Sequence, residues 1–68
     1  MANKRWEYMF ITEEDYKPKS VNGRDLPNWK SGPHISDYLN TLGGQGWEAT
    51  GLGVQGNHFY FLLKREIL

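Results

Sequence analysis

An α+β fold is expected for this chain, with a three-stranded antiparallel sheet and one helix on one of its faces. Three observations predict it: side chains alternate over residues 5–11, apolar residues recur at helical spacing over residues 35–42, and two strand-like segments flank a turn within residues 47–65. With 68 residues and 38% hydrophobic composition, the chain has room for one core, so a single domain over residues 1–68 is expected.

The first strand is expected over Arg5–Ile11. Its aromatic residues Trp6, Tyr8 and Phe10 all fall on one side of an extended chain. Almost every residue of the segment favours strands, and apolar residues occupy both sides. The strand therefore predicts a sheet with two largely apolar faces.

Residues 12–32 are interpreted as a long loop. The segment has no sustained hydrophobic period, and it contains Pro18, Asn22-Gly23, Pro27 and Gly32, which are typical of turns. Structureless loops of this length in compact domains are usually functional or disordered, so the segment is a candidate for function.

A helix is expected from Pro33 onward. Ser31 or Gly32 can cap its first turn, and Pro33 stands where a missing N–H group costs nothing. Gly43 and Gly44 are expected to end the helix in the left-handed conformation. The apolar stripe of this helix consists of Ile35, Tyr38, Leu39 and Leu42.

A hairpin is expected from Trp47–Val54 and His58–Arg65, joined by the three residues Gln55-Gly56-Asn57. Pairing Val54 with His58 places bulky rings beside glycines and brings opposite charges together. The resulting pairs are Gly53 with Phe59, Gly51 with Phe61, and Glu48 with Lys64. The last strand is the most continuously apolar and takes the centre, so the strand order is 1-3-2.

Three short motifs resemble a known family. They are Trp6-Glu7-Tyr8, the run from Leu39 to Glu48 (LNTLGGQGWE), and Leu63-Lys64-Arg65. This pattern resembles the short bacterial family called domain of unknown function 4177. The resemblance implies a strand, helix and hairpin fold, and it implies no established chemistry. The segment 12–32 and the glycines at 51 and 53 depart from the family pattern, so function is expected in these peculiar parts.

Composition argues against several functional classes. Eight basic and eight acidic residues give no net charge, which removes the bulk attraction behind non-specific nucleic-acid binding. The chain has no cysteine, no apolar run of about 20 residues and no apolar leader. A cytoplasmic protein that does not contact membranes is therefore expected.

Motifs for catalysis or metal binding are weak. Gly51 to Gly56 fits G-x-G-x-x-G, but strand-like sequence follows it where a dinucleotide site needs a helix. His34 and His58 lack the spacing of a metal site, and no serine lies in a nucleophile motif. We therefore expect no enzyme, no catalytic residue, no metal and no cofactor.

The aromatic content predicts a homo-oligomer, most simply a dimer. Aromatic residues make up 15% of the chain, and one helix can shield only one face of the sheet. An apolar face that stays open usually marks an interface. The alternative is that the loop 12–32 folds back and covers this face.

The charge of the loop predicts a small anionic, nucleotide-like ligand captured or sensed at a subunit boundary. Residues 16–34 contain four basic residues and one acidic residue. Arg24 can hold a phosphate or carboxylate through two hydrogen bonds, and Trp29 offers a stacking face. The expected ligand-binding residues are Tyr16, Lys17, Lys19, Arg24, Trp29, Lys30 and His34.

Three alternatives to this ligand site stay open. The domain could be a protein-interaction module with no small ligand. It could bind single-stranded nucleic acid through its aromatic strands, because Phe59-Tyr60-Phe61 is similar to the stacking platforms of RNA-binding modules. In the simplest alternative, the loop is solvated and Trp29 packs on its own sheet.

Overall fold

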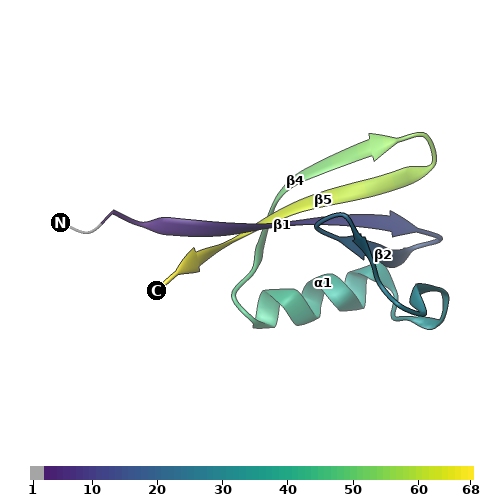
Figure 1. Ribbon diagram of the computed structural model, residues 1–68, viewed down its shortest axis with the longest axis horizontal. Helices are drawn as coiled ribbons and strands as arrows, with labels where there is room; N and C mark the ends of the chain where they lie inside the picture. Colours follow the sequence, from purple (N-terminus) through teal and green to yellow (C-terminus); the bar gives the residue numbers. More distant parts are fainter. Residues whose placement is uncertain (1–2) are drawn as a thin grey trace.

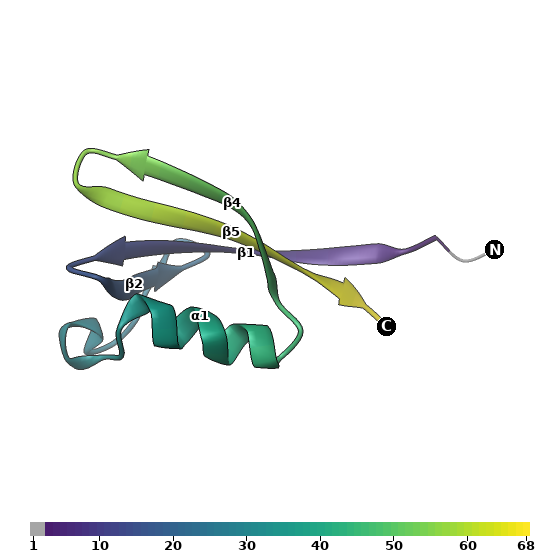
Figure 2. The same cartoon turned by 180° about the vertical axis from the view of Figure 1, so that it is seen from behind.

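A computed structural model describes residues 3–68, which form a five-stranded antiparallel sheet and one α-helix (Figures 1 and 2). The elements are β1 (Arg5–Glu14), β2 (Lys17–Val21), β3 (Arg24–Asp25), the 3-10 helix η1 (Trp29–Ser31), α1 (Ile35–Gly44), β4 (Glu48–Gln55) and β5 (His58–Ile67). The strand order is β3-β2-β1-β5-β4. The α+β class is thus confirmed, and the three expected strands, β1, β5 and β4, are neighbours in the expected order.

The expectation of a three-stranded sheet is wrong, because residues 12–32 extend the sheet and do not form a long loop. Residues 12–14 lengthen β1, and β2 and β3 follow as two further strands. The two connecting turns, Asp15-Tyr16 and Asn22-Gly23, have positive φ at both residues. Such turns match the twist of paired strands, so each one sends the chain back along its neighbour.

Asn22 fixes the second of these turns to β1. Its backbone N–H donates to the carbonyl oxygen of Phe10 at 2.7 Å, and its side-chain Oδ1 accepts from the Phe10 N–H at 2.8 Å. The side chain thus replaces one ladder hydrogen bond at the point where the chain leaves β2.

The start of α1 differs from the expectation. The helix begins at Ile35, and His34 is its N-cap, with Nδ1 accepting a hydrogen bond from the Ser36 N–H at 3.1 Å. Ser31 and Gly32 were expected to cap it, but their N–H groups donate within the η1 turn, to Asn28 and Trp29. The cap therefore moves to the next residue with an acceptor side chain.

The end of α1 also lies later than expected. Gly43 and Gly44 are still helical, and the left-handed residue is Gly46, with φ +94°. The Gly46 N–H donates to the carbonyl of Gly43, and the Trp47 N–H donates to that of Leu42, both at 3.1 Å. These two bonds form a Schellman motif, which directs the chain into β4.

The β4–β5 hairpin has a two-residue turn, Gly56-Asn57, closed by Gln55 and His58. The predicted three-residue turn is wrong, because Gly56 at φ +61° completes the tighter turn. The register consequently differs by one residue near the turn.

A β-bulge corrects this difference farther along the hairpin. It lies between Ala49 and Gly51, and beyond it Glu48 pairs with Lys64, as predicted. On the turn side of the bulge, Gly53 lies opposite Tyr60 and not Phe59. Gly51 likewise lies opposite Leu62 and not Phe61.

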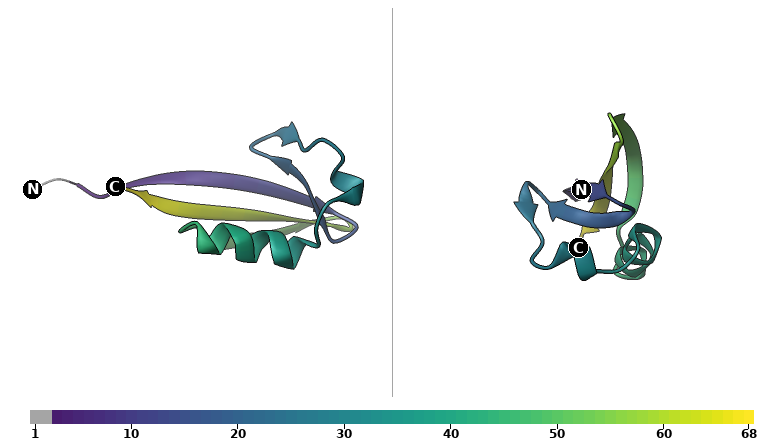
Figure 3. Two further views of the ribbon diagram at one scale, coloured as in Figure 1. Left: turned by 90° about the horizontal axis from the view of Figure 1, so that it is seen from below. Right: turned by 90° about the vertical axis from the view of Figure 1, so that its right-hand side faces the viewer.

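The core lies between α1 and one face of the sheet, and Figure 3 shows the helix on this side. Ile11 from β1 and Leu63 from β5 meet Ile35 and Leu42 from the helix. We call this side of the sheet the helix face. None of the helical segments within residues 3–68 is long and apolar enough to cross a membrane.

Candidate functional site

The sheet surface opposite α1 carries the largest group of exposed aromatic side chains, and we call it the open face. Strand pairing places Phe10 opposite Leu62 and Tyr8 opposite Lys64, so the even-numbered residues of β1 and β5 share this surface. Tyr8 is 58% exposed. The large side chains of the open face are Trp6, Tyr8, Phe10, Tyr60 and Leu62.

The rings of the open face are already ordered by contacts within the chain. Phe10 and Tyr60 lie 5.4 Å apart between ring centroids. Tyr60 also covers Gly53, where a Cβ atom would overlap its ring. The sequence predicted glycines beside rings, and the structure assigns this role to Tyr60.

The border of the open face carries charges of both signs. The Lys64 ammonium lies 4.4 Å from the centroid of the Trp6 ring, and Glu48 lies opposite Lys64 across the strands. Glu66 lies opposite Trp6. The middle of the open face is therefore apolar, and these three border residues are one basic and two acidic side chains.

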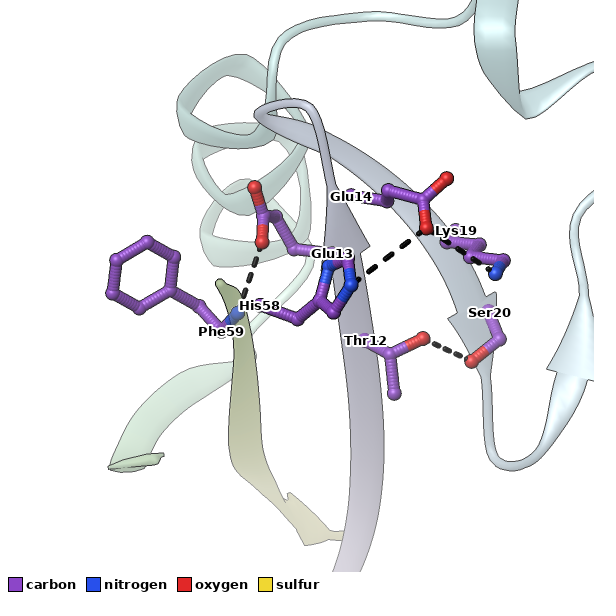
Figure 4. A network of polar contacts seen from close by, with 7 residues as sticks. All are labelled: Thr12, Glu13, Glu14, Lys19, Ser20, His58 and Phe59. Atoms are coloured by element: carbon purple, nitrogen blue, oxygen red, sulfur yellow. Dashed lines mark hydrogen bonds and ion pairs between the residues drawn. The ribbon is translucent and has the colours of Figure 1, made fainter. Parts of the chain in front are cut away.

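A hollow of about 200 Å³ lies at the end of β1 and includes side chains of the open face. Glu14 Oε1 lies 3.6 Å from Lys19 Nζ and 3.9 Å from His58 Nε2 (Figure 4). Thr12 and Ser20 form a hydrogen bond between their hydroxyl groups beside it. In this hollow the Glu14 carboxylate thus faces two nitrogen groups.

Glu13 lines the same hollow and has a structural role. Its side chain is buried, and Oε1 accepts the N–H of Phe59 at 2.9 Å while Oε2 accepts that of Tyr16 at 2.7 Å. One carboxylate thereby holds the start of β5 to the turn between β1 and β2. Glu13 is 4% exposed and each of its oxygens accepts a backbone N–H, so we assign it a structural role.

The structure brings four of the seven predicted ligand residues together around η1. The ammonium groups of Lys19 and Lys30 lie 5.6 Å and 5.8 Å from the centroid of the Trp29 ring. Lys17 Nζ donates a hydrogen bond to the carbonyl oxygen of Lys30. We call these residues, Lys17, Lys19, Trp29 and Lys30, the Trp29 cluster.

Two further predicted residues, Tyr16 and His34, form a stacked pair. Their rings are nearly parallel, 5° apart, with centroids 5.9 Å from each other. Tyr16 has φ +62°, a strained value for an aromatic residue, and the Ile35 N–H donates to its carbonyl at 2.7 Å. The pair therefore joins the β1–β2 turn to the start of α1. The Nδ1 atom of His34 already accepts the hydrogen bond that caps the helix.

Arg24, the seventh predicted residue, is not brought into the Trp29 cluster by any contact found in residues 3–68. It lies in β3, pairs with Val21, and lines a separate open hollow of about 510 Å³ with Asn22, Asp25 and Leu26. Asp25 offers a carboxylate in the same hollow. Arg24 was expected to hold a phosphate together with the lysines, but the lysines of the Trp29 cluster do not line the hollow that contains Arg24.

Sequence reasoning missed a second arginine, Arg65, which joins three distant segments. Its Nε donates to Glu7 Oε1 at 3.1 Å, and its guanidinium lies 4.4 Å from the centroid of the Trp47 ring. Its Nη1 also donates to the carbonyl of Gln45. Each segment belongs to one of the three motifs that carry the family resemblance, so these motif residues stabilise the fold.

Comparisons with protein-family models, with curated proteins and with solved structures gave no match. The resemblance to domain of unknown function 4177 accordingly stays a prediction. Among residues 3–68, no group of three or more histidine, cysteine or acidic side chains is arranged to hold a metal ion.

Proposed function

We propose that this chain is a non-enzymatic binding domain whose copies assemble through the open face. The observation that carries the proposal is the exposure of four large apolar side chains, Trp6, Tyr8, Phe10 and Leu62, on one continuous surface. Patches of this kind on a soluble domain mark interaction surfaces. The alternative cover, the segment 12–32, contributes β2 and β3 to one edge of the sheet, and Trp6, Tyr8, Phe10 and Leu62 stay exposed.

The small core supports assembly for energetic reasons. The buried hydrophobic side chains in residues 3–68 number four. Fully burying one large apolar side chain contributes about 1.5–3 kcal/mol, so covering the exposed part of the open face adds to the stability that the core supplies. As in the sequence analysis, we propose that the protein is cytoplasmic.

The carboxylates at the border of the open face favour a second copy over nucleic acid as its occupant. Glu66 lies opposite Trp6, and Glu48 lies opposite Lys64. A single strand of nucleic acid would bring phosphates beside these carboxylates, whereas a second copy offers a matching apolar surface and contributes its own Lys64.

Single-stranded nucleic acid is the second candidate, because Trp6, Tyr8, Phe10 and Tyr60 present four rings on one face. Stacking platforms use such rings to bind successive bases. Titration of a fluorescent oligonucleotide at low salt tests this function: affinity that falls steeply with salt supports it, and absence of binding at low salt rejects it.

A small anionic ligand at the Trp29 cluster completes the proposal. Two ammonium groups, those of Lys19 and Lys30, lie over the Trp29 ring, and Lys17 is bonded to the Lys30 carbonyl beside them. Lys19 also lines the hollow at the end of β1. This position supports a site at the boundary between two copies. Arg24 lies outside this site in β3, and Tyr16 and His34 form a separate stacked pair.

The test of assembly introduces a charge into the open face. Tyr8→Glu places a carboxylate opposite Lys64, which the folded monomer tolerates, but which an apolar interface does not. Asn40→Glu, on the exposed side of α1, is the matched control. Light scattering at equal concentration is expected to show a lower mass for Tyr8→Glu than for the control. Equal masses would reject the open face as the interface.

The test of ligand binding is a thermal-shift screen with nucleotides. A ligand present at about 100 times its dissociation constant stabilises the folded state by roughly 2.7 kcal/mol. Trp29→Ala is expected to abolish the shift, while Arg24→Ala retains it. A shift that survives Trp29→Ala, or a panel without any shift, would reject the site.

A further inference from the structure

The two edges of the sheet differ in how well they are protected from pairing. The β3 edge is two residues long, and both residues, Arg24 and Asp25, are charged. The β4 edge is eight residues long, and its one charged residue, Glu48, stands at its start. Short and charged edges resist pairing with other chains, whereas long uncharged edges invite it. The β4 edge therefore lacks the protection that the β3 edge has.

The side chains of β4 near the hairpin turn are unusually exposed for apolar residues. Leu52 is 66% exposed and Val54 is 61% exposed. Both lie on the helix face, since they pair with Phe61 and Phe59, yet α1 leaves them uncovered. An apolar stripe thus runs along the unpaired edge.

The backbone of the same two residues points away from β5. A two-residue turn is closed by a hydrogen bond between Gln55 and His58, and antiparallel pairs alternate between bonded and non-bonded. Leu52 and Val54 are therefore at non-bonded positions, where their N–H and C=O groups point outward to the free edge.

We propose that β4 pairs with β4 of a second copy, antiparallel, around a two-fold axis at Gly53. In this register Leu52 of each copy faces Val54 of the other, and the outward N–H and C=O groups of these residues satisfy one another. The four apolar side chains then form one cluster on the helix face. The sheet becomes continuous across both copies.

A second copy fits this edge because the register is self-complementary. Gly53 meets Gly53 of the other copy at the axis, where the absence of side chains allows close approach. Glu48 lies beyond the bulge between Ala49 and Gly51, so no like charges meet in the paired segment. The bulge twists the strand and confines the pairing to Gly51–Gln55.

This inference is independent of the proposed function, because it uses the edge of the sheet and not its open face. Either interface can exist without the other. A chain that uses both forms an assembly larger than a dimer. The experiment is therefore done in the Tyr8→Glu background, where assembly through the open face is weakened.

The first measurement is amide hydrogen exchange of the Tyr8→Glu chain at low and high concentration. We expect the amides of Leu52 and Val54 to gain protection as concentration rises, while the exposed amide of Gly23 in the β2–β3 turn does not. Fast exchange of both edge amides at every concentration would overturn the inference, even if the chain still assembles.

The second measurement adds Val54→Lys, with Asn40→Lys as its control at an exposed helix position. Sedimentation is expected to show that Val54→Lys loses the edge dimer and returns to a mass of 7.9 kDa. The control retains the dimer, and circular dichroism checks that both variants are folded. A Val54→Lys variant with undiminished mass would contradict the proposed register.

Discussion

Replacing Glu13 by alanine tests how much of the fold depends on one buried carboxylate. Glu13 is 4% exposed, and its two oxygens accept the N–H groups of Tyr16 and Phe59. The variant removes both acceptors at once and leaves two donors near the protein interior. Glu14 is the next residue along β1, and its partly exposed carboxylate lies 3.6 Å from Lys19 Nζ and 3.9 Å from His58 Nε2. Glu14→Ala is therefore a matched control.

The two variants should differ several-fold in their effect on the free energy of unfolding. A hydrogen bond to a charged group contributes about 1.5–3 kcal/mol, so losing two of them costs about 3 kcal/mol or more. Partly exposed ion pairs contribute less than about 1 kcal/mol, which bounds the effect of Glu14→Ala. A domain of this size has a total stability of about 3–10 kcal/mol, so Glu13→Ala removes a large part of it.

Thermal unfolding followed by circular dichroism measures this difference at one fixed protein concentration. We expect Glu13→Ala to lower the Tm by about 12 °C or more, and Glu14→Ala by a few degrees. Glu13→Gln should lose much of the same stability, because an amide offers one acceptor oxygen where two are needed. Equal Tm values for Glu13→Ala and Glu14→Ala would refute the role assigned to Glu13.

Two further substitutions test other local features. Gly53→Ala should lower the free energy of unfolding by about 1 kcal/mol, because its Cβ displaces the Tyr60 ring, whereas Gly51→Ala meets only ordinary contacts and should be neutral. Urea unfolding compares the two variants, and equal midpoints would contradict the packing of Tyr60 on Gly53. Asn22→Ala should cost about 1–2 kcal/mol, because it removes the acceptor for the Phe10 N–H and places alanine at φ +53°. If the Phe10 amide exchanges no faster in this variant, that hydrogen bond is not important for stability.

The helix and the order of the three main strands could be predicted because they depend on local periodicity. Ile35 and Leu42 lie about two helical turns apart and both enter the core. Alternation in β1 correctly separated the open face from the helix face. These signals are set by residues close together in the sequence, so no tertiary information was needed.

The two extra strands differed in how predictable they were. Asn22-Gly23 is a strong hairpin signal, and reading it as a turn between strands would have revealed β2 and β3. Asp15-Tyr16 carries no such signal, because tyrosine rarely adopts positive φ. Tyr16 is held there by Glu13, by the His34 ring and by the Ile35 N–H, and none of these contacts can be read from neighbouring sequence.

The sequence predicted which residues form the candidate ligand site, but not how they are arranged in space. The basic residues and Trp29 were found because they occur in one segment of the chain. Their arrangement follows from strand pairing, which places Lys19 at the β-bulge beside Glu14 and carries Arg24 to the β3 edge. Because β2 and β3 were not predicted, the sequence could not show that Lys19 and Arg24 lie apart.

Sedimentation of the unmodified chain over a range of concentrations tests the central claim, that the open face is an interface between copies. We expect a mass of at least twice 7.9 kDa at high concentration, with dissociation on dilution and a weaker association in Tyr8→Glu. A single species of 7.9 kDa at every concentration would contradict it, because the exposed rings of the open face would then have no second copy to cover them.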